Sequence, residues 1–170
     1  MASFLKKNFP FHTAATEPEK PGAKHDILLC KECQAAYWYK TWHHSLEDYP
    51  SEDINRNIKT TTCPACKMKA EGKYSGELIL ENIPADQYEE VKNLISNFGK
   101  LAFDNDPMAR IITLDELARG MIRTLTTQNQ MIGQLAKKIQ RTYKGKANLI
   151  HSKLDKIIRI RVVFPQGKGS

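Results

Sequence analysis

The sequence predicts an α+β protein in two parts: a small cysteine-bearing module of residues 25–73, followed by a larger domain of residues 74–164. Three observations support this prediction. The four cysteines of the chain form two C-x-x-C pairs within the first part. Stretches with strand and helix periodicity follow in the order β-α-β-β-α-β-β. A length of 170 residues is enough for a small metal module and a domain of roughly 100 residues.

The cysteine pairs are Cys30/Cys33 and Cys63/Cys66, with 29 residues between them. Together they can give four thiolates to one tetrahedral Zn²⁺, each at about 2.3 Å. About 15–20 intervening residues are usual, so the longer spacing predicts a zinc ribbon with an elaborated loop. Four cysteines close the coordination shell, which indicates a structural zinc. The lysines expected to offset part of its negative charge are Lys31, Lys67 and Lys69.

Three other interpretations of the cysteines compete with zinc. Disulfides need an oxidising compartment, and nothing in the sequence points to one. A thioredoxin-like dithiol needs a single C-x-x-C beside a βαβ unit, whereas this chain has two matched pairs. Buried free thiols would not explain the pairing. A structural zinc is therefore the preferred interpretation.

Residues 1–24 contain three phenylalanines, four lysines and three prolines without helix or strand periodicity. We expect a flexible arm, which could order on RNA or on a protein surface. This segment lacks the apolar core of a secretory signal, and no apolar run reaches the ~20 residues of a membrane span. A cytoplasmic protein without a membrane partner is therefore expected. Residues 165–170 are predicted to be a short tail.

An aromatic stretch, Tyr-Trp-Tyr-Lys-Thr-Trp at residues 37–42, follows the first cysteine pair and holds both tryptophans. As a single strand it would place Trp38, Lys40 and Trp42 on a common face. Two interpretations stay open. The rings can form the small core that covers the metal site. Alternatively, one face can stack on unpaired bases while Lys40 contacts phosphate.

Two adjacent histidines, His43 and His44, end this stretch. Neighbouring residues of a strand point to opposite sides, so the two rings cannot easily bind one ion. We expect surface or RNA-facing side chains here and no second metal site. Residues 45–58 are predicted to form the loop that lengthens the cysteine spacing. Short strands are expected at residues 26–29 and 59–62, immediately before each cysteine pair.

The elements of the second part follow from apolar periodicity and from residues that start or stop helices. Pro84 suits a first helical position, whereas Gly99 and Gly145 suit helix ends. Thr126 or Thr127 is expected to cap the second helix. The expected buried stripe of this helix consists of Ile132, Leu135, Ala136, Ile139 and Tyr143. The predicted elements are, in chain order, strand 77–80, helix 84–99, strand 109–114, turn 115–120, strand 121–126, a helix ending at Gly145, strand 147–151 and strand 156–164.

This order is that of the split β-α-β arrangement of ferredoxin-like folds with one added strand. Such a fold has an antiparallel sheet with both helices on one face. In the last strand, apolar residues alternate with Arg159 and Arg161, which should point outward from the open face. Whether Arg123 joins them depends on the strand register.

The net charge of +7 is unevenly distributed along the chain. Residues 77–118 carry three basic against nine acidic residues, a net charge of −6, and residues 119–170 carry twelve against one, a net charge of +11. A charge run can be an ordinary solvated face. A polyanion would neutralise this one, which favours nucleic acid as a partner. The predicted nucleic-acid-binding residues are Trp38, Lys40, Trp42, His43, Lys137, Lys138, Arg141, Lys144, Lys146, Arg159 and Arg161.

The two cysteine pairs, the aromatic stretch and three later segments resemble a family of zinc-ribbon proteins. This family includes the large-subunit nuclear-export adaptor of eukaryotes and its archaeal and bacterial relatives. The later segments are residues 120–127, 143–145 and 159–163, so the resemblance spans residues 28–164. It implies docking on the large ribosomal subunit. No second cysteine quartet or export signal is evident in the sequence, so export is not part of the expectation.

The sequence thus predicts a monomeric, zinc-stabilised RNA-binding protein that associates with the ribosome. Its expected partners are rRNA and ribosomal proteins of the large subunit. A DNA-binding zinc ribbon acting in transcription is the alternative, although no recognition helix with base-reading side chains is evident. An enzyme with a small-molecule substrate is not expected, because the sequence shows no nucleophile–base pair, P-loop or open metal position. The acidic segment 77–118 has no assigned role.

Overall fold

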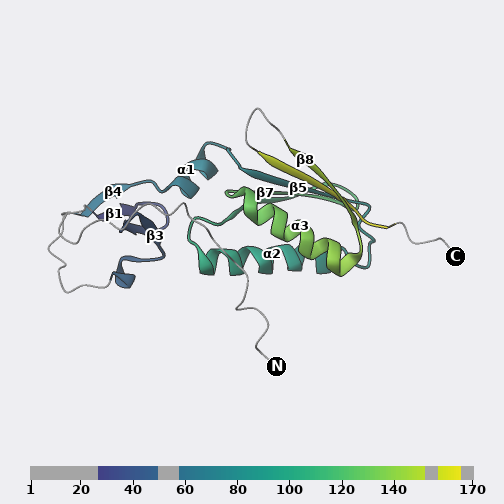
Figure 1. The fold of residues 1–170 in the computed structure, drawn as a ribbon, viewed down its shortest axis with the longest axis horizontal. Coiled ribbons are helices and arrows are strands. Elements are labelled where there is room, and N and C mark those ends of the chain that lie inside the picture. The colour runs from purple at the N-terminus through teal and green to yellow at the C-terminus, as the bar shows by residue number, and fades with distance from the viewer. Residues whose placement is uncertain (1–26, 50–57, 152–156, 166–170) are drawn as a thin grey trace, which may run out of the picture.

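The computed structural model describes residues 27–49, 58–151 and 157–165. The fold is α+β, with a four-stranded sheet in the N-terminal part and a five-stranded sheet in the C-terminal part of this described chain (Figure 1). No described helix is long and apolar enough to cross a membrane. The predictions for the N-terminal arm, for most of the 45–58 loop and for the tail after Pro165 lie outside the described residues.

The N-terminal sheet has the strand order β3-β2-β1-β4 and carries the cysteines. Its elements are, in chain order, β1 (Ile27–Cys30), β2 (Ala36–Trp38), β3 (Thr41–His43), the 3₁₀ helix η1 (Leu46–Asp48), β4 (Ile58–Thr61) and helix α1 (Pro64–Ala70). β1 pairs antiparallel with β2 and parallel with β4. The strands predicted before each cysteine pair are confirmed, whereas α1 was not predicted.

The aromatic stretch is a hairpin and not one strand, so the predicted common face of Trp38, Lys40 and Trp42 is wrong. Tyr39 and Lys40 have φ angles of 46° and 63°. Two successive left-handed residues make the tight turn that suits the twist of a β-hairpin. β2 and β3 therefore run antiparallel, and Tyr37 lies opposite Trp42 with ring centroids 5.3 Å apart.

The C-terminal domain has the predicted order of elements. They are β5 (Gly76–Glu81), α2 (Tyr88–Asn105), β6 (Ile111–Ala118), β7 (Met121–Thr126), α3 (Asn129–Tyr143), β8 (Lys146–His151) and β9 (Ile158–Val163). The strand order in the sheet is β6-β7-β5-β9-β8. Side chains of both helices enter one hydrophobic cluster with β5, β7 and β9, so both helices cover the same face, as predicted (Figure 1).

The sheet is mixed, which corrects the prediction of an antiparallel sheet. β5 pairs antiparallel with β7 and parallel with β9. The difference arises because two strands follow α3. β8 and β9 form an antiparallel hairpin, and β9, the second of them, lies beside β5. It therefore runs opposite to a single strand that would enter the same position directly from α3.

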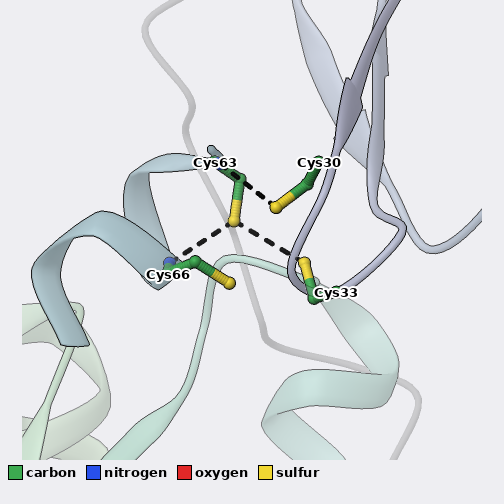
Figure 2. Close-up of side chains that lie close together, drawn as sticks. All are labelled: Cys30, Cys33, Cys63 and Cys66. Carbon is green, nitrogen blue, oxygen red and sulfur yellow. Dashed lines mark hydrogen bonds between the residues drawn. The ribbon is translucent and has the colours of Figure 1, made fainter. Parts of the chain in front are cut away.

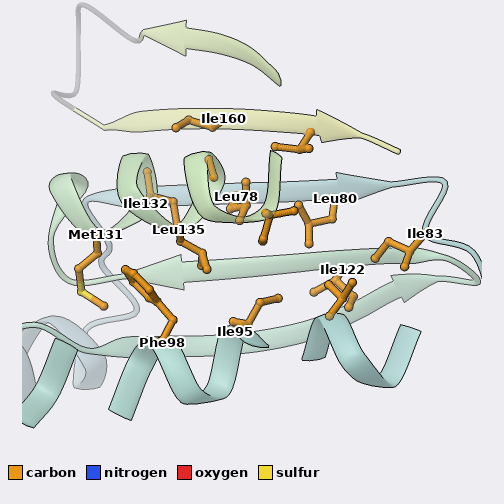
Figure 3. Packing of buried hydrophobic residues seen from close by; sticks show 14 of the residues in the cluster. Leu78, Leu80, Ile83, Ile95, Phe98, Ile122, Met131, Ile132, Leu135 and Ile160 are labelled. Carbon is orange, nitrogen blue, oxygen red and sulfur yellow. The ribbon is translucent and has the colours of Figure 1, made fainter. Parts of the chain in front are cut away.

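The core lies between the sheet and the two helices (Figure 3). Alternate residues of the central strands point into it because side chains of a strand alternate between faces. The predicted buried stripe of the second helix, from Ile132 to Ile139, is confirmed, as is the inward apolar face of the last strand. The large buried side chains of the core include Leu78, Leu80, Val91, Ile95, Phe98, Ile122, Met131, Ile132, Leu135, Ile139, Ile160 and Val162.

The first long helix begins and ends later than predicted. Its start is delayed by a turn in which the Gln87 N–H donates to the Pro84 carbonyl at 3.0 Å, so α2 begins at Tyr88. Gly99 lies inside the helix. A Cβ at Gly99 would lie 2.6 Å from Cδ1 of Ile111. Glycine there gives room for Ile111 of β6 and does not stop the helix.

The predicted caps of the second helix are also wrong. Gln128 is the N-cap of α3 and makes no side-chain capping bond. The hydroxyls of both predicted caps are used elsewhere. Thr126 donates to the Gln128 carbonyl at 2.9 Å, and Thr127 donates to the Met108 carbonyl at 2.7 Å. Thr127 thus joins α3 to the chain that leads into β6.

The open face of the sheet carries ion pairs centred on Glu77. This residue of β5 is only 7% exposed, and its two carboxylate oxygens accept bonds from Nε of Arg123 at 2.6 Å and Nε of Arg159 at 3.2 Å. Arg161 pairs with Glu81 at 3.2 Å. The outward direction of Arg159 and Arg161 is therefore as predicted, and Arg123 joins them. Acidic residues of β5 neutralise the basic residues of its neighbours.

Replacing Glu77 with Ala should lower the free energy of unfolding by roughly 2 kcal/mol, because the change leaves two arginines without their shared carboxylate. The loss should stay below that of a fully buried pair, since the side chains of Arg123 and Arg159 are 32% and 31% exposed. Glu81→Ala is the matched control, because Glu81 pairs with the more exposed Arg161. Denaturant unfolding measures both, and equal losses in the two variants would contradict this account.

Candidate metal centre

The four cysteines come together where β1 ends and α1 begins (Figure 2). Cys30 is the last residue of β1, and Cys33 lies in the turn that follows. Cys63 is the N-cap of α1, and Cys66 lies in its first turn. All four sulfur atoms lie within 4.8 Å of one another. The structure thus unites the predicted ligand set.

The first cysteine turn is closed by backbone hydrogen bonds. The Cys30 N–H donates to the Ala35 carbonyl at 2.8 Å, and the Gln34 N–H donates to the Cys30 carbonyl at 2.9 Å. Gln34 completes the turn with a left-handed φ of 62°. This geometry holds Cys33 beside Cys30. Parallel pairing of β1 with β4, in which Cys30 lies opposite Thr61, then brings the first turn next to the second.

The second cysteine turn is the start of a helix. Pro64 occupies the beginning of α1, where a backbone N–H is not needed. The Cys66 N–H donates to Sγ of Cys63 at 3.4 Å, and the Cys63 N–H donates to Sγ of Cys30 at 3.3 Å (Figure 2). Backbone N–H groups thus point at two of the sulfurs. Bonds of this kind favour the thiolate form that binds metal.

The spacing of the sulfurs fits one tetrahedral ion. Four sulfurs at about 2.3 Å from a central ion would lie roughly 3.8 Å from each other. The Sγ atoms of Cys33 and Cys63 are 3.7 Å apart. A disulfide requires about 2.05 Å, and all four cysteines are free. The group is therefore a plausible four-thiolate metal site.

Burial and hydrogen bonding shift the thiol pKa values in different directions. Burial raises the pKa of Cys30, but N–H groups of Cys63, Cys33 and Glu32 lower it more, to about 6. Burial raises the pKa of Cys63 and of Cys66 above the ordinary thiol value. At neutral pH the thiols of Cys63 and Cys66 therefore keep their protons. A metal ion has to displace these protons to bind all four sulfurs.

An arginine of the C-terminal domain completes the surroundings of the cysteines. Arg110, immediately before β6, places Nη2 at 3.1 Å from Sγ of Cys33 and Nη1 at 3.6 Å from Sγ of Cys66. Burial lowers the pKa of Arg110, but the bond to Cys33 and the negative charge of the thiolates raise it more. Sequence reasoning missed this residue. The one available signal was that segment 77–118 contains only three basic residues, and Arg110 is one of them.

Both tryptophans of the N-terminal sheet pack into its small core. Trp38 is 3% exposed and stacks on His43 with ring centroids 3.7 Å apart. Trp42 is half-buried and packs against the cysteines. Trp38 and the His43 face stacked on it are therefore not open to an unpaired base, so Trp38 is a core residue in this structure. Burial also lowers the pKa of His43, which favours its neutral form.

The basic residues predicted to bind phosphate fall into two groups. Arg159 and Arg161 are engaged by Glu77 and Glu81 on the open face of the sheet. The other group lies on α3 and just after it and is exposed. Within the described residues, none of its members forms an ion pair. We call this group the basic row; it consists of Lys137, Lys138, Arg141, Lys144 and Lys146.

No protein-family model, curated protein or solved structure matches the chain significantly. Membership of a family is therefore not shown. What the structure does establish is an α+β fold whose N-terminal sheet carries four clustered cysteines.

Removing the metal should unfold the N-terminal sheet while the C-terminal domain keeps its structure. Both tryptophans of the chain, Trp38 and Trp42, lie in the N-terminal sheet, so tryptophan fluorescence reports on this part alone. A chelator, or Cys63→Ser, should shift the emission to longer wavelength because the rings become solvated. Circular dichroism should retain the signal of α2 and α3. Unchanged emission after complete metal removal would exclude a metal-dependent fold.

Zinc affinity should weaken as the pH falls, because protons compete for the sulfurs. From pH 8 towards pH 6 the raised pKa values of Cys63 and Cys66 already oppose binding. Below pH 6 protonation of Cys30, whose pKa is about 6, should make the loss steeper. Calorimetric titration in buffers of different ionisation enthalpy measures affinity and proton release together. An affinity that stays constant between pH 8 and pH 5 would contradict thiolate ligation.

Proposed function

We propose that the chain is a zinc-stabilised RNA-binding protein that associates with the large ribosomal subunit. The basic row carries this proposal, because its exposed cations lack acidic partners among the described residues. Zinc is the proposed ion, since four thiolates in a closed tetrahedral arrangement suit it and leave no open position for catalysis. The N-terminal part is then a zinc ribbon. The C-terminal domain keeps the element order of a ferredoxin-like fold, but it adds the edge strand β8, and its last strand, β9, runs parallel to β5.

The basic row suits a phosphate backbone. Lys137 and Arg141 lie at the i and i+4 positions of one side of α3, with Lys138 beside them. Lys144 is the C-cap of the helix, and Lys146 begins β8, so the row continues past the end of α3. Contacts with phosphates position a protein without reading sequence. The shape of folded rRNA would therefore provide most of the selectivity.

The open face of the sheet is a weaker candidate for phosphate binding. Arg159 and Arg161 would have to exchange the carboxylates of Glu77 and Glu81 for phosphates. Glu77 is buried between Arg123 and Arg159, so this exchange would leave its buried carboxylate with Arg123 alone and one oxygen without its bond from Arg159. We therefore place the primary RNA contact on the basic row.

The ribosome enters the proposal through the resemblance of residues 28–164 to zinc-ribbon proteins that dock on the large subunit. A polyanionic partner also balances the net charge of +11 in residues 119–170. The proposal takes the protein to be cytoplasmic and monomeric, without catalytic activity. DNA shares the phosphate chemistry, so duplex DNA is the ligand against which rRNA binding has to be compared.

The double variant Lys137→Glu/Lys138→Glu should lower the affinity for rRNA at least tenfold, because it removes two phosphate contacts and adds repulsion. With five contacts, log K should fall against log salt with a slope of roughly −3.5, and the variant should flatten this slope by about 1.5. Filter binding or fluorescence anisotropy at several salt concentrations measures both quantities. Bound zinc should be unchanged, because the substitutions lie outside the cysteine site.

The matched control is Lys100→Glu/Arg119→Glu, which changes the net charge equally at two other exposed positions. It should bind rRNA with nearly the affinity of the wild type. A low-salt sucrose gradient of cell extract tests the ribosome itself: the wild type should sediment with the large subunit, and the basic-row variant should not. A wild-type protein confined to the ribosome-free fractions, or one that prefers duplex DNA to rRNA, would overturn the proposal.

A further inference from the structure

A tetrathiolate centre needs a compensating charge. Four thiolates around one divalent ion leave a net charge of −2, which is costly in a site whose Cys30 and Cys63 are buried. The lysines that the sequence places nearby do not fill this role at close range. Lys31, Lys67 and Lys69 are exposed, and Lys67 reaches towards Glu71 at 4.0 Å. Among the hydrogen bonds of the described residues, those from a cationic side chain to the sulfurs come from Arg110.

The side chain and backbone of Arg110 are fixed by contacts within the C-terminal domain. Its Nε donates to the Pro107 carbonyl at 2.8 Å, which leaves the two Nη groups to face the sulfurs. The guanidinium also lies over the ring of Phe103, with Cζ 5.1 Å from the ring centroid. The backbone is fixed as well, since the Arg110 N–H donates to Oγ1 of Thr127 at 2.8 Å. Its two donors are thus preorganised for two ligands of the metal.

Arg110 is the last residue of a hydrogen-bonded segment, residues 106–110, which we call the bracket. The Met108 N–H donates to Oδ1 of Asp106 at 2.8 Å, and the Thr127 hydroxyl donates to the Met108 carbonyl at 2.7 Å. Nε2 of Gln128, the N-cap of α3, donates to Oδ2 of Asp106 at 2.8 Å. On its other side the bracket meets the metal site, where Met108 packs against the buried cluster of Cys30, Ala35, Cys63 and Ala65.

A second contact between the two parts lies beside the first. Nε2 of His44 lies 3.2 Å from the Asp104 carbonyl, to which it can donate. The rings of His44 and Phe103 pack nearly perpendicular to each other, in a T-shaped arrangement with centroids 4.9 Å apart. Phe103 therefore contacts His44 of the N-terminal part with its ring and also makes a cation–π contact with Arg110. The contacts that fasten the ribbon to the C-terminal domain thus converge on residues 103–110.

We infer that Arg110 is a positioning residue of the metal centre: it neutralises ligands from both cysteine pairs and fastens the ribbon to the start of α3 through the 106–110 bracket. Metal occupancy then orders the junction between the two parts of the chain, as well as the ribbon itself. This inference rests on the proposed metal centre and goes beyond RNA binding. Partners that hold metal ligands from outside the coordination shell are worth about 10–100-fold in metal affinity.

The test compares zinc binding by full-length wild type, Arg110→Met and Arg110→Lys in competition with a chromophoric chelator. Arg110→Met should raise the apparent dissociation constant for zinc about 10–100-fold, because it removes both N–H···S bonds and the charge. Arg110→Lys keeps the charge but loses the planar fork, so its effect should be intermediate. Arg119→Met, at an exposed arginine in the β6–β7 turn, should match the wild type.

Hydrogen exchange of the wild type tests the junction without any substitution. Removing zinc should raise exchange in peptides that cover the bracket and Thr127, whereas the central strands β5 and β7 should stay protected. Unchanged exchange in the bracket would overturn the coupling, even if Arg110→Met fails to fold. Equal zinc affinity of folded Arg110→Met and wild type would overturn the role of Arg110 alone. A wild type that binds no zinc would overturn the proposed metal centre and this inference with it.

Discussion

Bringing four cysteine sulfurs within 4.8 Å of one another is the constraint on which the N-terminal part depends. Apart from the cysteines, the buried hydrophobic residues described in this part are Ile27, Ala35, Ala36, Trp38 and Ala65, with a few half-buried neighbours. So small a core cannot offset the conformational entropy lost on folding. A metal ion that binds all four sulfurs would supply the missing free energy and would also remove the protons that burial keeps on Cys63 and Cys66.

Ion pairs between the acidic and the basic segment form in the C-terminal domain. They largely determine which basic side chains remain available to bind a partner. Glu77 and Glu81 belong to the acidic segment, and they engage Arg123, Arg159 and Arg161 of the basic segment. Arg110, a cation within the acidic segment, instead donates hydrogen bonds to the cysteine sulfurs. The exposed cations without acidic partners among the described residues then include the basic row on α3. The same distribution of charges thus stabilises the sheet through ion pairs and leaves the basic row available as the proposed RNA-binding surface.

Local patterns were enough to predict the clustering of the four cysteines, the order of the elements, and the buried faces of α3 and β9. They failed where a distant contact decides the outcome. Gly99 was predicted to stop a helix, but it accommodates Ile111 of a later strand. The parallel pairing of β9 with β5 depends on which strand of a hairpin reaches the sheet, and Arg110 is 44 positions from Cys66 in the chain. The continuous aromatic strand was wrong for a local reason, the left-handed turn at residues 39–40.

The central claim is that all four cysteines bind one zinc ion, held against the C-terminal domain by Arg110. X-ray absorption at the zinc edge of the purified full-length protein tests the coordination most directly. The account predicts a single shell of four sulfurs at about 2.3 Å, with no nitrogen or oxygen ligand. A shell that contains nitrogen or oxygen, or a protein without zinc, would contradict it.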